Sequence, residues 1–425
     1  MVACGTGKQQ PTENEFVYVK DGQFIRHGKP YYYVGTNFWY GAILGSEGTG
    51  GNRTRLCQEL DSLKALGIDN LRILVGADGQ RGVPTKVEPT LQTAPGVYND
   101  TILAGLDYLL AEMNKRDMLA ILYLNNSWEW SGGYGMYLEW SGHGKAPVPA
   151  VDGWPQYMEY VKQYAKSDSA QAIFKNYVKD IITRTNRYTG KKYTEDPTIM
   201  SWQIGNEPRA FADENKEAFA NWMADVAALI DSLAPNQLIS SGSEGKHGCE
   251  QDIALFEKIH SNPHIDYLNI HIWPYNWGWA NKDSLVANLD RAKENTGKYI
   301  AEHMAVAERC KKPVVIEEFG YPRDGFQFGL ETPVTSRNGY YEYIFKEVQK
   351  NAAQKGLLAG CNFWGWGGMA IPSKEHTFWQ VGDDYCGDPA QEEQGLNSVF
   401  ISDKETTALV KSANDALQAA VEEKK

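Results

Sequence analysis

The chain has 425 residues, of which 42% are hydrophobic, so it can bury a sizeable core as one large α/β barrel or as two or three smaller domains. Its formal net charge of −12 and its pI near 5.3 argue against a nucleic acid or an anionic membrane as partner, because both require a basic surface. The sequence contains no run of 18 or more apolar residues, which excludes a candidate transmembrane helix.

The first 15 residues are polar and predict a flexible leader ahead of a single domain over residues 16–425. The opening Met1-Val-Ala-Cys-Gly5 resembles the end of a bacterial lipoprotein signal in which Cys4 carries the lipid. No apolar segment follows Met1, so a complete signal peptide is missing. We therefore expect a secreted protein or a bacterial cell-surface lipoprotein anchored through Cys4, and a monomer.

A β-hairpin is predicted where Asp21-Gly22 separates the alternating segments 16–19 and 23–26, and we place it at the bottom of a barrel. Eight strand-like segments follow, each with a helix-like segment after it. The strands are expected over residues 32–37, 69–75, 118–125, 199–204, 238–241, 267–272, 313–318 and 358–364. The helices are expected over residues 53–66, 102–116, 170–187, 214–233, 252–259, 285–310, 336–355 and 406–421.

This alternation predicts the α/β class and a (β/α)8 TIM barrel with a short N-terminal β-hairpin. A doubly wound sheet is the alternative, but the Gly-x-Gly-x-x-Gly typical of that fold is absent after the first strand. In a TIM barrel the active site lies at the C-terminal ends of the strands. Three long segments at that end, residues 76–100, 127–168 and 366–397, are expected to shape the cleft.

Two of the predicted strands end on acidic residues that are candidates for catalysis. The fourth strand leads into Asn206-Glu207-Pro208, and the seventh ends on Glu317 and Glu318 before Phe-Gly. One carboxylic acid that donates a proton and one carboxylate that acts as nucleophile or base are what glycosidic bond cleavage requires. A helix-capping role for Asn206 and Glu207 is the structural alternative. Because successive side chains of a strand point to opposite faces, we expect Glu318 at the barrel mouth and Glu317 on a structural partner.

Arg72 and His271 are the other ionisable residues predicted at this rim. Arg72 lies inside the apolar segment 70–74, where a cation is costly unless paired, and pairing with the nucleophile would lower the pKa of that carboxylate. His271 ends the sixth strand. A structural salt bridge and a hydrogen-bonded core histidine are the respective alternatives.

Aromatic and amide side chains gather in the predicted rim segments of a chain with 13 Trp and 24 Tyr. Core packing explains any one of them, whereas a cleft whose indole faces stack on sugar rings explains their concentration. Asn amides suit hydroxyl recognition. These residues are Asn125, Asn126, Trp128 and Trp130 after the third strand, and Trp364 and Trp366 after the eighth.

Together these motifs resemble glycoside hydrolase family 5, and the resemblance covers residues 16–421. They are Trp202-Gln-Ile-Gly-Asn-Glu-Pro208, Val315-Ile-Glu-Glu-Phe-Gly320, Asn70-Leu-Arg72, His271 and Asn362-Phe-Trp364. Within the family, the segments around Asn125-Asn126, Gly132-Gly133-Tyr134 and His271 look like those of endo-β-1,4-mannanases.

The resemblance implies Glu207 as acid/base, Glu318 as nucleophile and Asn206 as the ligand of the sugar 2-hydroxyl. It further implies that Arg72 and His271 support the two carboxylates and that Trp364 forms the floor of the subsite before the cleavage point. Many mannanases carry a Tyr two residues after this His, where the present chain has Trp273. Either nearby Tyr275 takes that part or it is absent.

The expected activity is therefore cleavage of internal β-1,4-mannosidic bonds of mannan, galactomannan or glucomannan with retention. A β-1,4-glucanase with the same catalytic residues is the nearest alternative, and a non-catalytic glycan-binding barrel is a more distant one. Because Cys-x-x-Cys and His-x-His spacings are absent, we expect no metal and no cofactor. Retention predicts the two carboxyl groups about 5 to 5.5 Å apart.

Overall fold

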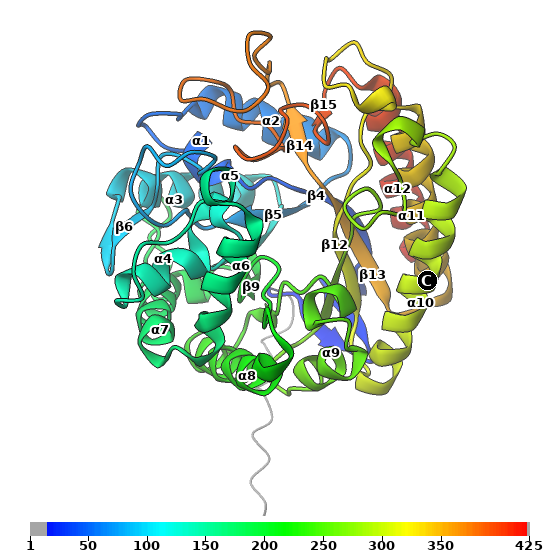
Figure 1. Ribbon diagram of the computed structural model, residues 1–425. Helices are drawn as coiled ribbons and strands as arrows, with labels where there is room; N and C mark the ends of the chain where they lie inside the picture. Colours follow the sequence, from blue (N-terminus) through cyan, green and yellow to red (C-terminus); the bar gives the residue numbers. More distant parts are fainter. Residues whose placement is uncertain (1–14, 423–425) are drawn as a thin grey trace, which may run out of the picture.

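The computed structural model describes residues 15–422 and shows an eight-stranded parallel sheet rolled into a barrel with helices around it (Figure 1). The expected leader, Cys4 included, lies outside the described residues except at Glu15. The strand order is β10-β9-β8-β5-β4-β13-β12-β11. The strands are β4 (Tyr33–Asn37), β5 (Asn70–Leu74), β8 (Leu119–Tyr123), β9 (Ile199–Gln203), β10 (Leu238–Ser240), β11 (Leu268–Ile272), β12 (Val314–Phe319) and β13 (Leu358–Phe363).

Asp266 closes the barrel seam between β10 and β11. Its backbone N–H donates to the carbonyl of Ile239 at 2.8 Å, and its carboxylate accepts the N–H of Ile239 at 2.8 Å. The TIM barrel and all eight of its predicted strands are confirmed, and every strand is buried along its whole length. That burial explains why these segments are continuous apolar runs in the sequence.

Helices follow the strands at the predicted places. The long ones are α2 (Arg53–Ala65), α3 (Asp100–Lys115), α7 (Asp168–Ile182), α8 (Lys216–Leu233), α9 (Ile253–His260), α10 (Leu289–Cys310), α11 (Thr335–Gln354) and α12 (Lys404–Glu422). The helix predicted to reach residue 187 stops at Ile182. The Asn186 side chain accepts the backbone N–H groups of Tyr188 and Thr189, and this local turn replaces the helical pattern.

The predicted hairpin is confirmed as β1 (Tyr18–Lys20) and β2 (Gln23–Arg26), to which β3 (Lys29–Pro30) adds a third antiparallel strand. Phe24 packs at the N-terminal end of the barrel together with Tyr31 and Tyr33. These rings cover apolar side chains from the starts of five barrel strands, namely Leu119, Met200, Leu238, Val315 and Ala359. The hairpin therefore seals the bottom, which leaves the opposite end for the site.

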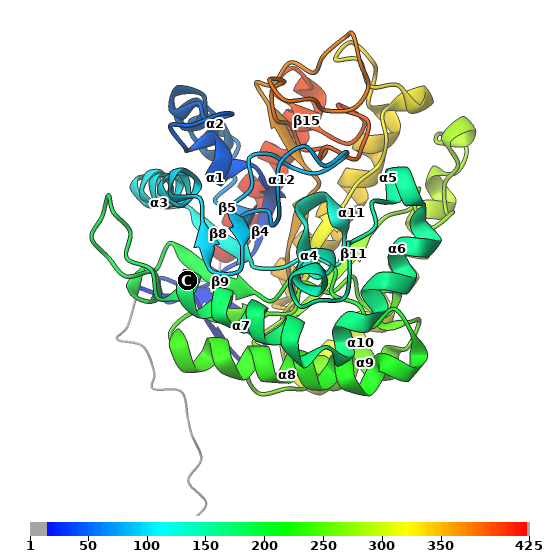
Figure 2. The same cartoon turned by 60° about the vertical axis from the view of Figure 1, so that its left-hand side comes forward.

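The long segments at that opposite end contain structure that the sequence analysis left as loops. They hold the helices α4 (Gly133–Trp140), α5 (Pro149–Asp152) and α6 (Trp154–Val161), the strand pair β6 (Gln92–Ala94) with β7 (Val97–Tyr98), and the strand β14 (Trp366–Gly368). Outside these segments, the short helix α1 (Gly41–Leu44) follows β4, and β15 (Val399–Phe400) pairs with β14. Figure 2 shows α4, α5 and α6 together on one flank of the barrel. These additional elements surround the mouth of the barrel.

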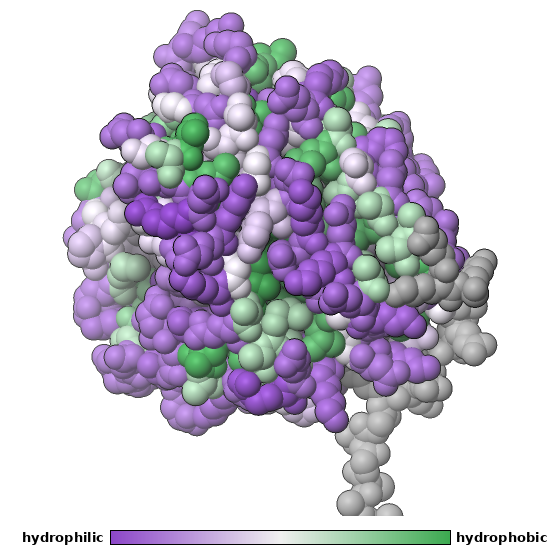
Figure 3. Space-filling view, turned by 90° about the vertical axis from the view of Figure 1, so that its right-hand side faces the viewer, coloured by the Kyte–Doolittle hydropathy of each residue, from purple (hydrophilic) through white to green (hydrophobic). Residues whose placement is uncertain are grey.

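The helices turn polar faces outward. Figure 3 shows the face on the right of Figure 1 as mostly hydrophilic, with hydrophobic side chains in small separate patches. Residues such as Tyr340, Ile344 and Val348 form the inner face of α11 and are completely buried. Within residues 15–422, no helix combines the length and the apolar character needed to cross a membrane.

Candidate active site

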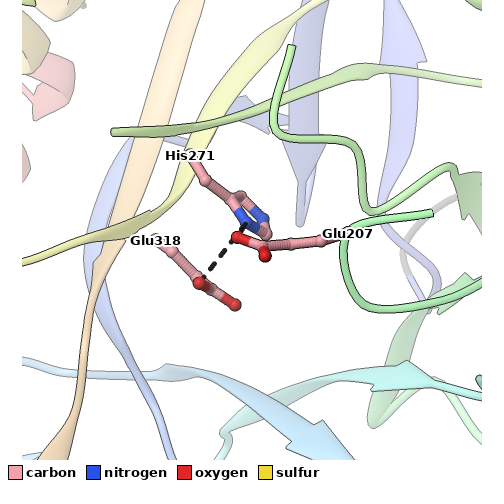
Figure 4. A group of neighbouring side chains, drawn as sticks. All are labelled: Glu207, His271 and Glu318. Atoms are coloured by element: carbon pink, nitrogen blue, oxygen red, sulfur yellow. Dashed lines mark hydrogen bonds and ion pairs between the residues drawn. The ribbon is translucent and has the colours of Figure 1, made fainter. Parts of the chain in front are cut away.

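Glu207 and Glu318 meet at the C-terminal mouth of the barrel. Glu207 follows β9, and Glu318 lies near the end of β12 (Figure 4). One carboxylate oxygen of each and Nδ1 or Nε2 of His271 all lie within 4.8 Å of one another. A separation of about 6.5 to 9.5 Å is typical of inverting enzymes, because a water molecule must fit between the carboxylates, whereas about 5 to 5.5 Å is typical of retaining ones. The geometry is that of the retaining class.

The backbone at Glu207 is held in an unusual conformation. Its φ of +49° lies in the left-handed region, which a residue with a Cβ rarely adopts. The Glu207 N–H donates to the carbonyl of Gly242 at 3.0 Å. On the side chain, Oε2 accepts the indole N–H of Trp128 at 2.6 Å, and Oε1 lies 2.8 Å from His271 Nδ1. Such strain is typical of functional positions, where the surroundings fix the side chain.

Glu318 is bound by a cation and a second indole. Arg72 donates to Glu318 Oε1 at 2.5 Å, and Trp273 Nε1 donates to Oε2 at 3.2 Å. His271 Nδ1 lies 3.4 Å from Oε2. Each carboxyl of the pair therefore has its own tryptophan N–H donor, and the two share His271.

The register of β12 corrects one expectation. Beside β11, Ile316 pairs with Ile270, but the next pair is Glu318 with His271, so Glu317 is an extra residue in a bulge. Strict alternation is thereby broken, and both glutamates reach Arg72, with Glu317 Oε2 at 3.7 Å from its Nε. The expectation that the two side chains point to opposite faces was wrong, although Glu317 does have structural partners, Gln203 and Tyr267.

Arg72 is fully buried and organises the ring of side chains below the carboxylates. Besides Glu318, it donates to Asn206 Oδ1 at 2.8 Å, Gln203 Oε1 at 2.8 Å and Asn37 Oδ1 at 3.0 Å. The planar guanidinium has five N–H donors in a fixed fork, so it fixes several acceptors at once. Because Asn206 Oδ1 is used here, its amide group is held in one orientation, with Nδ2 donating to Asn126 Oδ1 at 3.2 Å.

The charges of the pair follow from burial and from Arg72. Burial raises the pKa of both carboxyls, and the proximity of Glu207 raises that of Glu318 further, so the pair retains a proton. The guanidinium in direct contact with Glu318 opposes this and favours the charged form there. Arg209 and Arg72 also favour the ionised form of Glu207, but of the two carboxyls Glu318 is the one in direct contact with a guanidinium, so we expect the shared proton on Glu207.

His271 is neutral in this environment. Burial, together with the cations Arg72 and Arg209, holds its pKa well below the ordinary value for histidine. A neutral imidazole carries one proton, and Nδ1 is the nitrogen that faces both carboxylates, so we place the proton there. His271 then donates to the pair without adding a positive charge.

Comparison with known proteins gives the family. Residues 14–422 match the family model described as "GH family 5 beta-mannosidase-like". The chain belongs to glycoside hydrolase family 5. Among solved structures, a glycoside hydrolase family 5 mannosidase from Rhizomucor miehei is 31% identical, with a TM-score of 0.89 over 97% of this chain and 99% of the other.

Relatives from plants extend the family assignment. A rice protein named putative mannan endo-1,4-β-mannosidase 9 is 28% identical over 81% of this chain and 82% of its own length. The tomato mannan endo-1,4-β-mannosidase 4 is 28% identical over 83% of this chain and 84% of its own length. The predicted family membership and the prediction of a glycoside hydrolase are confirmed.

The cleft of this family 5 enzyme has a volume of about 530 Å³ and contains half of the predicted binding residues. Asn206, Trp128, Trp273 and Trp364 all line it beside the two glutamates. Arg72 and His271 lie beneath it, fully buried. The indole N–H of Trp364 is buried without a hydrogen-bond partner among the described residues, while other atoms of its ring line the cleft.

Two predicted binding residues lie elsewhere. Asn126 sits behind the cleft wall, where it donates to Ser131 at 2.8 Å and accepts from Asn206. The Tyr275 ring packs against Phe326, with ring centroids 4.9 Å apart, and it does not line the cleft. Trp273 itself donates to Glu318, so the place expected for a tyrosine hydroxyl is taken by an indole.

An ion pair that the sequence did not predict lies beside Glu207. Arg209 donates to Glu244 Oε2 at 2.6 Å, and both line the cleft. The Arg209 guanidinium lies over the Trp128 ring, 5.1 Å from its centroid, and opposes the effect of burial on the pKa of Glu207. Their positions in the sequence could have indicated this pair, because Arg209 directly follows Asn-Glu-Pro and Glu244 follows the short fifth strand. Glu129 and Glu392 also line the cleft, from segments left as loops.

Proposed function

We propose that the enzyme cleaves internal β-1,4-mannosidic bonds of mannan, galactomannan or glucomannan by double displacement with retention. The close approach of Glu207 and Glu318, whose oxygens lie within 4.8 Å, carries the mechanism. The substrate follows from the plant relatives, which are named mannan endo-1,4-β-mannosidases.

In the first step Glu318 attacks the anomeric carbon, while protonated Glu207 gives its proton to the departing glycosidic oxygen. The product is a glycosyl ester on Glu318 and a free chain end. In the second step Glu207, now ionised, accepts a proton from water as the water oxygen attacks the anomeric carbon, and Glu318 leaves as a carboxylate. Arg72 supports both steps because it holds Glu318 charged and oriented.

The polar and aromatic lining of the cleft fits this reaction. Asn206 and Trp364 line the cleft together with both carboxyls, where they offer an amide for a sugar hydroxyl and an indole ring for stacking. The apolar faces of pyranose rings stack on indole rings, and their hydroxyl groups satisfy unpaired buried donors and acceptors. Trp128 and Trp273 are already bonded to the catalytic glutamates, so they also fix the walls.

The test is reducing-end release from linear mannan, galactomannan, glucomannan and carboxymethyl cellulose by the wild type and by Glu318→Gln. We expect rapid release from the three mannans, little from cellulose, and loss in the variant. A fall in galactomannan viscosity ahead of extensive release would show internal cleavage, and proton NMR of the first products would show the β-anomer.

Each contrary result has a distinct meaning. Preference for cellulose would transfer the same chemistry to β-1,4-glucan, and mannose as the sole early product would replace internal cleavage with release of terminal units. An α-anomer as first product would contradict retention. Activity that survives Glu318→Gln would mean that another carboxylate is the nucleophile.

We also propose that the enzyme is exported and held at a bacterial cell surface by lipid on Cys4. The support is the Met1-Val-Ala-Cys-Gly5 segment alone. Detergent phase partitioning of the protein from its native cells tests this: a detergent-phase enzyme that becomes aqueous on Cys4→Ser supports the anchor, and an aqueous wild type contradicts it.

A further inference from the structure

A second pocket of about 430 Å³ lies next to the catalytic cleft. It is enclosed by the segment after β5, by α4 and by residues 145–148. Its partition from the cleft is thin: Thr85 and Pro149 line the cleft, while their chain neighbours Lys86 and Val148 line the pocket. Glu129 lines both spaces.

Lys86 is a buried cation in this pocket with no direct partner. Only 6% of its surface is exposed, and within residues 15–422 its ammonium makes no hydrogen bond and no ion pair. Asp78, Glu139 and Glu129 attract it only from beyond ion-pair distance, and burial lowers its pKa. Burying an unbonded ammonium is costly, so this donor is poised for something absent from the protein itself.

Glu129 is a second polar residue at this pocket. It is 7% exposed, and its Oε2 is closed off from solvent without a hydrogen-bond partner among the described residues. Burial raises its pKa to about 7. The Lys86 ammonium is therefore the unpartnered polar group that the pocket offers to a ligand.

The remaining lining indicates a neutral polyhydroxyl ligand. Trp140, Met136 and Tyr157 give aromatic and apolar surface, a composition typical of sites for small molecules with a few fixed polar groups. Arg81, Lys86 and Lys145 line the pocket together with Glu129 and Glu139, so an anion and a cation would each meet charges of both signs. A sugar ring offers an apolar face together with hydroxyls that both donate and accept.

We propose that this pocket binds a hexopyranosyl branch of the polysaccharide whose backbone occupies the catalytic cleft, with Lys86 donating to the branch hydroxyls. The inference rests on the proposed mannanase function for its backbone. The branch crosses the rim between Thr85 and Pro149, so a galactosyl side group is accommodated where a plain cleft wall would reject it.

Gly135 of α4 offers a clean way to fill the pocket. A Cβ built there meets Ala146 Cβ at 3.4 Å and a Tyr157 ring carbon at 3.7 Å, which are ordinary contacts, and both neighbours line the pocket. Gly135→Ala is therefore a matched control, while Gly135→Phe projects a ring into the space. Neither touches the cleft, because Gly135 does not line it.

The experiment compares kcat/KM on galactomannan with that on linear manno-oligosaccharides. We expect Gly135→Phe and Lys86→Met each to lower the galactomannan value about tenfold or more and to leave the linear value within about twofold, with Gly135→Ala unchanged on both. Lys86→Met should also raise Tm, because it removes an unpaired buried charge. Equal losses on both substrates, or no loss on either, would overturn the proposal.

Direct binding separates this inference from the proposed function. Isothermal titration with methyl α-galactoside as the probe should give heat with Gly135→Ala and none with Gly135→Phe, whether or not the enzyme cleaves mannan. A wild type without mannanase activity would remove the proposed backbone substrate, while the titration would still decide whether the pocket takes a sugar. Equal heats from both variants would show that it does not.

Discussion

Glu317 and Glu318 are neighbours on one strand, both are buried, and both reach Arg72, yet they belong to different layers of the barrel. Glu317 lies in a closed layer, where it accepts the Gln203 amide at 2.5 Å and the Tyr267 hydroxyl at 3.1 Å. Glu318 is one residue closer to the mouth of the barrel, where it lines the cleft and lies next to Glu207. Burial alone therefore does not distinguish a catalytic carboxyl from a structural one; access to the cleft does.

The bulge is what makes this comparison possible. Without the extra residue, alternation would send one glutamate outward, and Arg72 would have a single anionic partner at this strand. With the bulge, Arg72 lies close to Glu317 in the closed layer and also contacts Glu318 at the cleft. Burial raises the pKa of Glu317 to about 7, and Arg72 opposes that rise.

The largest difference is expected between the isosteric variants Glu318→Gln and Glu317→Gln. Glu318→Gln removes the attacking oxygen charge, so kcat on linear mannan should fall more than about 10⁴-fold while the substrate still binds. Glu317→Gln should lower kcat less than about tenfold, and its main effect should be lower stability, because a hydrogen-bonded buried carboxyl is replaced. Steady-state kinetics with urea unfolding of both proteins checks this; a reversed order would exchange the two assignments.

Arg72→Lys should give the next largest effect, about 10²- to 10³-fold in kcat/KM, because an ammonium cannot reproduce the fork that holds Glu318, Asn206 and Gln203. Lysine keeps the positive charge but cannot keep the short hydrogen bond to Glu318 together with the other two, so ionised Glu318 is less stabilised and its pKa rises. Activity needs that group ionised, and the acidic limb of the pH profile should move to higher pH.

Arg323→Lys is the matched control for that prediction. Arg323 is also fully buried and pairs with Asp403 at 2.6 Å, but it lies outside the cleft lining. It should lose stability while keeping the wild-type pH profile. An unshifted acidic limb in Arg72→Lys would contradict the role of Arg72 in charging Glu318.

Removal of the two indole donors should have smaller effects, each on a different limb of the pH profile. Trp128→Phe takes an N–H from Glu207, which raises the pKa of the proton donor, so the alkaline limb should move to higher pH. Trp273→Phe takes an N–H from Glu318 and should move the acidic limb to higher pH instead. Each should lower kcat about three- to tenfold, the worth of one hydrogen bond. The same limb moving in both variants would contradict the separate pairings.

Much of this site was predictable because it depends on strand ends. A parallel barrel brings all strand C-termini to one rim, so Glu207, Glu318, Arg72 and His271 meet although they lie far apart in sequence. The positions of the strands, which continuous apolar runs reveal, are enough to predict that these residues meet. Side-chain geometry is not required for that prediction.

The features that escaped the sequence depend on contacts between segments without strong periodicity. Glu317 turned inward because of a bulge that the apolar pattern does not mark. Arg209 with Glu244, and Lys86 with Glu129, come from loops whose relative placement only the folded chain fixes. Tyr275 lies close to His271 in sequence, but the turn after β11 directs its ring to Phe326.

The smallest effect on activity is expected from Tyr267→Phe in the closed layer. The variant removes hydrogen bonds to Glu317 and Ser201, and the free energy of unfolding should fall by about 1 to 3 kcal/mol because a buried carboxylate loses a donor. Tyr33→Phe is the control, since the Tyr33 hydroxyl is buried without a partner among the described residues and its loss should cost less. Both should keep kcat within about twofold. If Tyr267→Phe instead lowered kcat tenfold at unchanged stability, the Glu317 layer would belong to the catalytic site, and access to the cleft would not be what separates the two glutamates.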